Sequence, residues 1–104
     1  MICRSAFNIY PKEVEDVLYT HPAVAEAQVV GIPDLVKGEE VVACIALKPS
    51  QNITGEDIIQ FCRKNMAAYK VPRYVRFFES LPKTVTGKLE KMTLRKIVQG
   101  DLGR

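Results

Sequence analysis

The sequence lacks the features that would identify a membrane-spanning, secreted or metal-binding protein. No apolar stretch approaches the roughly 18 residues of a membrane-spanning helix, and the first residues do not combine a basic segment with a long apolar one. The three cysteines, Cys3, Cys44 and Cys62, are odd in number and widely spaced, which fits neither a disulfide framework nor a zinc motif. These absences predict a soluble, cytoplasmic protein with reduced cysteines and no metal site.

Motifs for catalysis and nucleotide binding are also scarce. His21, the only histidine, is followed by proline and has no acid or nucleophile nearby in the sequence, so we expect it in a turn. Neither a glycine-rich dinucleotide loop nor a Walker-type phosphate loop is present. At 104 residues the chain corresponds to one domain, which is small for an enzyme with deep clefts for two or three substrates. The length is therefore a first indication that the chain is a fragment.

Charge is divided unevenly along the chain. Residues 1–60 carry 4 Lys/Arg against 9 Asp/Glu, a net charge of −5, whereas residues 61–104 carry 11 against 3, a net charge of +8. The basic half is suited to an anionic partner such as a nucleotide, coenzyme A or a nucleic acid. A charged surface that only faces solvent is the alternative interpretation.

Three helices are expected from the capping residues and the apolar spacing. Pro11, which suits a first helical position, begins a helix over residues 11–19. Thr54 and Asp57 resemble a capping box that opens a second helix ending near Ala67. The third helix covers residues 90–98, with one side for burial and the other, including Lys91, for solvent or a ligand. Its expected buried residues are Met92, Leu94, Ile97 and Val98.

Three strands are expected between these helices, over residues 24–30, 41–47 and 74–78. In the middle strand, the residues that point to one face and those that point to the other are all apolar, which predicts a central strand covered on both faces. A turn over residues 31–34 and a polar loop over residues 37–40 separate the first two strands. Pro72 makes residues 69–73 an extended connector. Together the pattern predicts an α+β fold, a small mixed sheet of about three strands packed with three helices.

A short loop rich in hydroxyl groups places a lysine just before the third helix. Gly87 lets the backbone bend at low steric cost, Thr84 and Thr86 offer hydroxyls, and Lys88 supplies a compact ammonium group. This combination suits a phosphate group. A polar turn between a strand and a helix is the structural alternative, since turns of this composition are common.

Four stretches together resemble the C-terminal small domain of adenylate-forming acyl-CoA synthetases, a superfamily shared with nonribosomal peptide adenylation domains and luciferases. They are residues 7–15, residues 30–34 with Gly38-Glu39, residues 69–73, and residues 81–88 ending in Thr86-Gly87-Lys88. They occur in the order and at the spacing of that family and cover nearly the whole chain. The large N-terminal adenylation domain of the family, with its ATP loop and acyl pocket, is absent from these 104 residues.

The resemblance implies a two-step ligase with ATP, Mg²⁺ and coenzyme A as substrates, none of them expected to be held by this domain alone. A carboxylate, expected to be a fatty or similar acid, attacks the α-phosphorus of ATP to give an acyl-adenylate and pyrophosphate. The thiol of coenzyme A then displaces AMP to give a thioester. The small domain is mobile in this family, because it rotates between the two half-reactions.

The resemblance also assigns residues to the two steps. Lys88 matches the adenylation lysine, carried by a loop that includes Thr86 and Gly87. A second group matches the loop that lines the pantetheine tunnel, namely Ser5, Ala6, Phe7 and Asn8. Ala6 stands where the family generally has glycine, which could weaken the thioester step. Lys70, Arg73 and Arg76 are candidate contacts for the phosphates of coenzyme A, and structural or solvent-exposed roles are the alternative for each.

Two other functions remain open. The acceptor could be a carrier-protein thiol instead of free coenzyme A, with the fold unchanged. A nucleic-acid-binding module would use the basic C-terminal half together with its interleaved aromatic residues. The residues in question are Tyr69, Lys70, Arg73, Tyr74, Arg76, Phe77 and Phe78.

Overall fold

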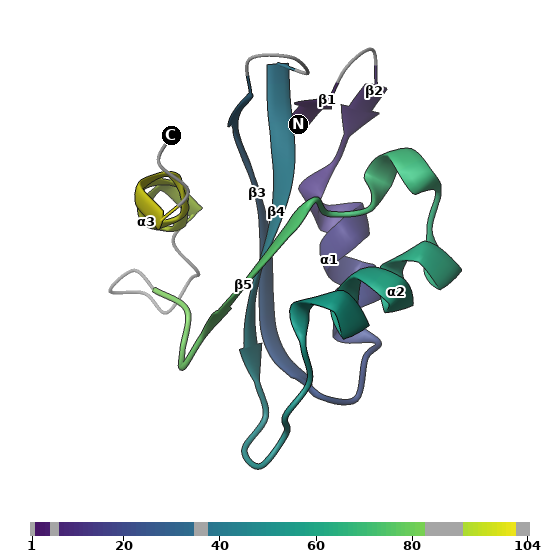
Figure 1. Ribbon diagram of the computed structural model, residues 1–104, viewed down its shortest axis with the longest axis vertical. Coiled ribbons are helices and arrows are strands. Elements are labelled where there is room, and N and C mark those ends of the chain that lie inside the picture. The colour runs from purple at the N-terminus through teal and green to yellow at the C-terminus, as the bar shows by residue number, and fades with distance from the viewer. Residues whose placement is uncertain (1, 5–6, 35–37, 83–90, 102–104) are drawn as a thin grey trace.

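Two long antiparallel strands, β3 (Val24–Asp34) and β4 (Gly38–Leu47), form the centre of the fold (Figure 1). The computed structural model describes residues 2–4, 7–34, 38–82 and 91–101. β5 (Tyr74–Phe78) runs parallel to β4 along Val42–Ala46. β1 (Ile2–Arg4) touches β4 through the pair Arg4–Gly38 and forms a hairpin with β2 (Phe7–Ile9). The sheet is therefore mixed, as expected, but within the described residues it has five strands where the sequence predicted about three.

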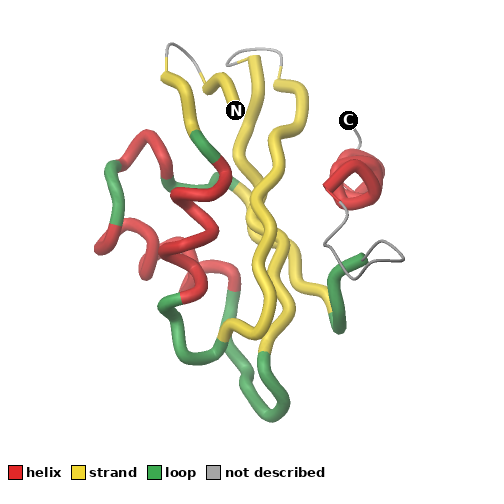
Figure 2. The backbone as a smooth tube through the Cα atoms, turned by 180° about the vertical axis from the view of Figure 1, so that it is seen from behind, coloured by secondary structure: helices red, strands yellow, loops and turns green. Residues whose placement is uncertain are grey.

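Helices cover both faces of this sheet. α1 (Pro11–Tyr19) and α2 (Gly55–Asn65) lie on one face, and α3 (Lys91–Asp101) lies on the other, as Figures 1 and 2 show from opposite sides. A single 3₁₀ turn, η1 (Ala68–Lys70), follows α2. Within the described ranges, no helix is both long and apolar enough to cross a membrane.

The apolar residues of β4 divide the core into two clusters. Side chains along a strand point alternately to opposite faces, so Val41, Ala43 and Ile45 enter the first cluster while Val42, Cys44 and Ala46 enter the second. All six are at most 2% exposed. The predicted central strand with two covered faces is confirmed.

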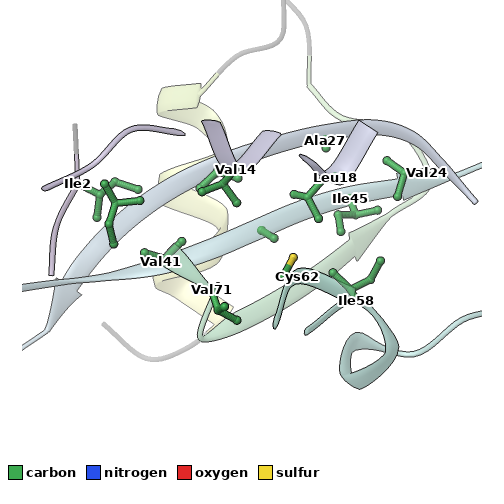
Figure 3. Packing of buried hydrophobic residues seen from close by; sticks show 13 residues of the cluster. Ile2, Val14, Leu18, Val24, Ala27, Val41, Ile45, Ile58, Cys62 and Val71 are labelled. Atoms are coloured by element: carbon green, nitrogen blue, oxygen red, sulfur yellow. The ribbon is translucent and has the colours of Figure 1, made fainter. Parts of the chain in front are cut away.

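The first cluster packs between the sheet and the helices α1 and α2 (Figure 3). It consists of Ile2, Ile9, Val14, Leu18, Val24, Ala27, Val29, Val41, Ala43, Ile45, Ile58, Cys62 and Val71. The second cluster packs between the sheet and α3. It consists of Val30, Ile32, Val42, Cys44, Ala46, Leu81, Leu94 and Val98.

The starts of the first two helices agree with the sequence prediction, while the predicted start of the third, residue 90, lies outside the described residues. α1 has the predicted bounds and begins at a proline, whose missing N–H costs nothing in the first turn. At α2 the capping box is complete, since the Asp57 N–H donates to Thr54 Oγ1 at 3.1 Å and the Thr54 N–H donates to Asp57 Oδ2 at 3.0 Å. α2 ends at Asn65, two residues before the predicted end.

The predicted turn over residues 31–34 and loop over residues 37–40 are wrong, because β3 continues to Asp34 and β4 already begins at Gly38. Burial overrides the local turn signals: Ile32 is fully buried and Glu40 is 2% exposed. Pro33 is tolerated because β3 is an edge strand. Gly38 has φ +86°, a conformation that favours glycine and lets β4 begin there.

Three other elements differ from the prediction. The hairpin of β1 and β2 was missed, since strands of three residues are too short to show a periodic pattern. The connector over residues 69–73 is not wholly extended, because it begins within η1. α3 runs through Gly100 to Asp101, and Met92, predicted to be buried, is 69% exposed. Leu94 and Val98, one helical turn apart, carry the burial instead.

Candidate functional site

Most of the predicted lysine loop lies outside the described residues, as do Ser5 and Ala6. Lys88, Thr86 and Gly87 belong to the range 83–90, for which the structure gives no description. The structure does describe both flanks of this range. On the N-terminal side, Leu81 is 2% exposed in the second cluster, and its N–H donates to Glu26 Oε1 on β3 at 3.3 Å.

On the C-terminal side, Lys91 begins α3 and contacts two other elements. Its Nζ lies 2.6 Å from Glu15 Oε2 on α1 and donates to the carbonyl of Val29 on β3 at 3.0 Å. The Val29 N–H donates to the same carboxylate oxygen at 2.9 Å. Sequence reasoning assigned Lys91 to solvent or a ligand and did not predict this network. Its partners are 76 and 62 positions away in sequence, so no local pattern points to it.

The two described members of the predicted pantetheine loop lie on β2. Phe7 is 50% exposed, and its ring stacks on that of Tyr69 with centroids 4.6 Å apart and an interplanar angle of 17°. Asn8 Oδ1 accepts a long contact from Cys3 Sγ at 3.8 Å. The structure therefore brings β2 together with η1, the segment that carries Lys70.

Lys70 is bound to the first helix. Its Nζ lies 2.6 Å from Glu13 Oε2 and 5.5 Å from the centroid of the Tyr69 ring. The hydrogen bond to Glu13 raises the pKa of the Lys70 ammonium group above its ordinary value. The ammonium also borders a hollow of about 170 Å³ between the start of α1 and the end of α2.

Arg73 and Arg76 line a different hollow. A groove of about 270 Å³ runs beside β5, between the first turn of α2 and Val98 of α3. The Arg73 guanidinium lies 5.5 Å from the Tyr74 ring centroid, and Arg76 Nη1 donates to the carbonyl of Phe77 at 3.0 Å. Lys70 and Arg73 thus border separate hollows in the described part of the chain.

The aromatic residues around these cations do not share one open face. Tyr69 and Phe77 pack against the first cluster, and Tyr74 and Phe78 pack against the second. A platform for stacking bases needs rings that are exposed side by side. This arrangement does not favour the nucleic-acid-binding alternative.

The buried cysteines are not suited to nucleophilic chemistry. Burial raises the pKa of Cys44 to about 12 and that of Cys62 to about 11, and a thiol reacts as its thiolate. Cys3 is exposed. His21 lies just after α1, where its Nδ1 accepts from the Ala23 N–H at 3.1 Å, so its predicted place in a turn is confirmed.

A family model matches most of the chain. Residues 13–88 match the AMP-binding enzyme C-terminal domain. This range includes most of the first helix, the strands β3, β4 and β5, and the predicted lysine at its last position.

Curated relatives and solved structures agree with that match. The chain is 50% identical over 103 residues to a mitochondrial medium-chain acyl-CoA ligase of Danio rerio, covering 99% of this chain and 17% of that protein. It is 44% identical over 96 residues to a putative acyl-CoA synthetase of Bacillus subtilis, covering 92% of this chain and 18% of that protein. A Mycobacterium tuberculosis fatty acyl-CoA synthetase superposes with TM-score 0.90 at 34% identity, covering 97% of this chain and 20% of that one. The chain thus spans about one fifth or less of the proteins it resembles.

Proposed function

The chain belongs to the family of AMP-binding enzyme C-terminal domains, and we propose that it serves an ATP-dependent acyl-CoA ligase whose large adenylation domain lies outside these 104 residues. The observation that carries this proposal is the nearly complete match of the chain to proteins named acyl-CoA ligases or synthetases. The proposed whole enzyme is an acid–thiol ligase. Its substrates are a carboxylic acid, ATP with Mg²⁺, and coenzyme A.

The proposed reaction has two steps. A carboxylate oxygen attacks the α-phosphorus of ATP, which forms the acyl-adenylate and releases pyrophosphate. The thiol of coenzyme A then attacks the acyl carbon, AMP leaves, and the thiol proton is released. A medium-chain ligase and a fatty acyl-CoA synthetase among the relatives favour a fatty acid as the acyl donor.

Lys88 is the proposed catalytic residue of the first step. Its ammonium group would face the carboxylate and the phosphate while charge moves onto pyrophosphate, with Thr86 and Gly87 shaping its loop. A fixed cation aimed at such charge in a site that excludes water typically contributes about 3 to 4 kcal/mol to the barrier reduction. The position of Lys88 at the end of the family match supports this role.

The second step would use the opposite end of the chain. Ser5, Ala6, Phe7 and Asn8 are proposed to line the path of the pantetheine arm. The half-exposed ring of Phe7, already supported by Tyr69, offers an apolar wall for such an arm. This support makes Phe7 the best-placed of the described candidates.

Lys70 and Arg73 are proposed to contact the phosphates of coenzyme A. Lys70 would first have to exchange the Glu13 carboxylate for a phosphate, because the two side chains lie 2.6 Å apart. Arg73 borders an open groove beside β5 and needs no such exchange with a carboxylate described here. The geometry therefore favours Arg73 over Lys70 for this contact.

The proposal is tested on the intact ligase that contains this chain. With a fatty acid, ATP, Mg²⁺ and coenzyme A, we expect AMP and pyrophosphate to form together with an acyl-CoA thioester identified by mass. A carrier domain bearing a pantetheine thiol replaces coenzyme A in a parallel reaction. Thioester formation on the carrier alone would assign the enzyme to the carrier-loading alternative, and release of neither AMP nor pyrophosphate would refute the proposal.

A further inference from the structure

The outer edge of β3 is closed by side chains from α1 and α3. Among the described strands, β3 pairs only with β4, on one side, so backbone groups that point the other way need different partners. The Tyr19 hydroxyl forms two hydrogen bonds with the backbone of Ala27: it accepts from the N–H at 3.1 Å and donates to the carbonyl at 3.3 Å. Two positions on, Glu15 accepts from the N–H of Val29 and Lys91 donates to its carbonyl.

The contact of Lys91 is more than a surface ion pair. Exposed pairs contribute little to stability because water screens them, but the Glu15 side chain is only 13% exposed. Its carboxylate oxygen binds the Val29 N–H at 2.9 Å and the Lys91 ammonium at 2.6 Å. α1, β3 and α3 are therefore joined at one point, although α1 and α3 lie on opposite faces of the sheet (Figure 1).

β3 also holds the chain on the other flank of the range 83–90. The buried Leu81 donates its N–H to Glu26, three residues before Val29 on the same strand. Both flanks are thus attached to β3. Leu81 is held by its buried apolar side chain and a hydrogen bond to Glu26, and Lys91 by its contacts with Glu15 and the Val29 carbonyl. Lys91 lies three residues after Lys88, a chain distance of at most about 11 Å.

We propose that Glu15 and Lys91 are positioning residues for Lys88, because they fix the start of α3 on the edge of β3 and the chain between Lys91 and Lys88 is only three residues long. The inference rests on the proposed function of Lys88. Because a displacement of about 1 Å at a reacting group can lower a rate on the order of a hundredfold, an anchor three residues away affects the step that uses the lysine. Steps that do not use Lys88 are insensitive to this anchor.

The test compares the two half-reactions in variants of the intact ligase. Lys91→Met removes the ammonium group, and Glu15→Gln removes the carboxylate charge while keeping its size. Both are expected to slow acyl-adenylate formation on the order of tenfold or more and to leave thioester formation from supplied acyl-adenylate unchanged. Lys91→Arg, which keeps the charge and the donors, should retain most of the adenylation rate.

The controls separate positioning from general destabilisation. Lys12→Gln breaks a pair with Asp16 on the same helix, whose side chains are 84% and 63% exposed, and should change neither half-reaction. The double variant of Glu15 and Lys91 should lose no more than the worse single variant, since the two act as one unit. Circular dichroism and thermal unfolding establish that each variant is folded.

Three outcomes would contradict either the positioning role of Glu15 and Lys91 or the proposed function of Lys88. Equal loss of both half-reactions in Lys91→Met and Glu15→Gln would identify a merely structural role and overturn the inference. Unchanged adenylation in both variants would overturn it as well, provided that Lys88→Ala, measured in parallel, lowers adenylation on the order of a hundredfold or more. Full adenylation by Lys88→Ala would instead overturn the proposed function of the lysine, and the inference with it.

Discussion

At the scale of single residues, Ser50 adopts a backbone conformation that its side chain disfavours. It has φ +66°, following Pro49 in a turn closed by a hydrogen bond from the Gln51 N–H to the Lys48 carbonyl at 3.2 Å. A type II turn requires positive φ at this position, where glycine is the favoured residue. The fold therefore holds a small backbone strain at the end of β4.

Ser50→Gly is expected to stabilise the chain by about 0.5 to 1 kcal/mol, because relief of the left-handed strain exceeds the added flexibility of glycine in the unfolded state. Urea unfolding monitored by circular dichroism measures the effect. Ser50→Ala keeps a Cβ and is the matched control, with no gain expected. A gain for alanine equal to that for glycine would contradict the explanation.

The three thiols should differ sharply in reactivity. Cys3 is exposed, whereas burial raises the pKa of Cys44 to about 12 and of Cys62 to about 11. An aromatic disulfide reagent at mildly alkaline pH should modify Cys3 rapidly and the other two only as fast as the protein unfolds. Cys3→Ser should therefore show no fast phase, and fast modification of all three thiols would contradict the described core.

Alkaline pH should also weaken the fold through these two buried thiols. A thiol whose pKa is raised in the folded state contributes stability below its unfolded pKa and loses that contribution as pH rises toward the folded value. For Cys44 this window runs from 9.0 to about 12. Thermal unfolding across that window should show a smaller loss of stability in Cys44→Ala than in the parent chain, and an equal loss would contradict the buried thiol.

Individual residues were predictable where chemistry and spacing are local. The pair Thr54 and Asp57 was identified by its separation and forms the expected cap. Met92 was assigned to the core because its position fits an apolar stripe, yet it is 69% exposed. An apolar stripe predicts which side of a helix faces the core, but how much of that side is buried depends on the sheet that packs against it.

At the scale of elements, α2 depends on its capping box. Thr54→Ala removes the acceptor for the Asp57 N–H and should destabilise the chain by about 1 kcal/mol. Thr54→Ser retains the hydroxyl and should behave like the parent in urea unfolding. If the serine variant loses as much as the alanine variant, the contribution of Thr54 lies in its methyl group rather than in capping.

The elements that sequence reasoning misjudged are those determined by distant partners. β3 and β4 extend through apparent turn residues because they pair with each other as far as Asp34 and Gly38. Gly38 also pairs with Arg4 of β1. The hairpin of β1 and β2 is held by the burial of Ile2 and Ile9 in the first cluster. Local turn signals carry no information about these contacts.

At the scale of the whole molecule, two clusters on either side of one sheet give the chain the core of an independent domain. Its radius of gyration, 13.0 Å, matches the value of about 13 Å for a compact domain of this size. The fold class and the order of its main elements followed from the sequence. The candidate site could be predicted only in part. Its proposed function depends on a second domain, and the contact of Lys91 with Glu15 joins side chains that are far apart in the sequence.

We expect the isolated chain to fold and to be catalytically inactive. It should unfold cooperatively in urea, since two clusters of buried side chains pack on the two faces of its sheet. It should form no acyl-adenylate from a fatty acid and ATP, because one lysine cannot replace the nucleotide and acyl sites proposed for the large domain. Adenylate formed by the purified 104 residues would show that those sites lie within this chain.

The proposed role of Lys88 is tested most directly by the effect of Lys88→Ala on the two half-reactions of the intact ligase. Pyrophosphate exchange reports acyl-adenylate formation, and thioester formation from supplied acyl-adenylate reports the second step. We expect adenylation to fall on the order of a hundredfold to a thousandfold and thioester formation to be largely retained. Equal losses in both half-reactions, or none in adenylation, would contradict that role.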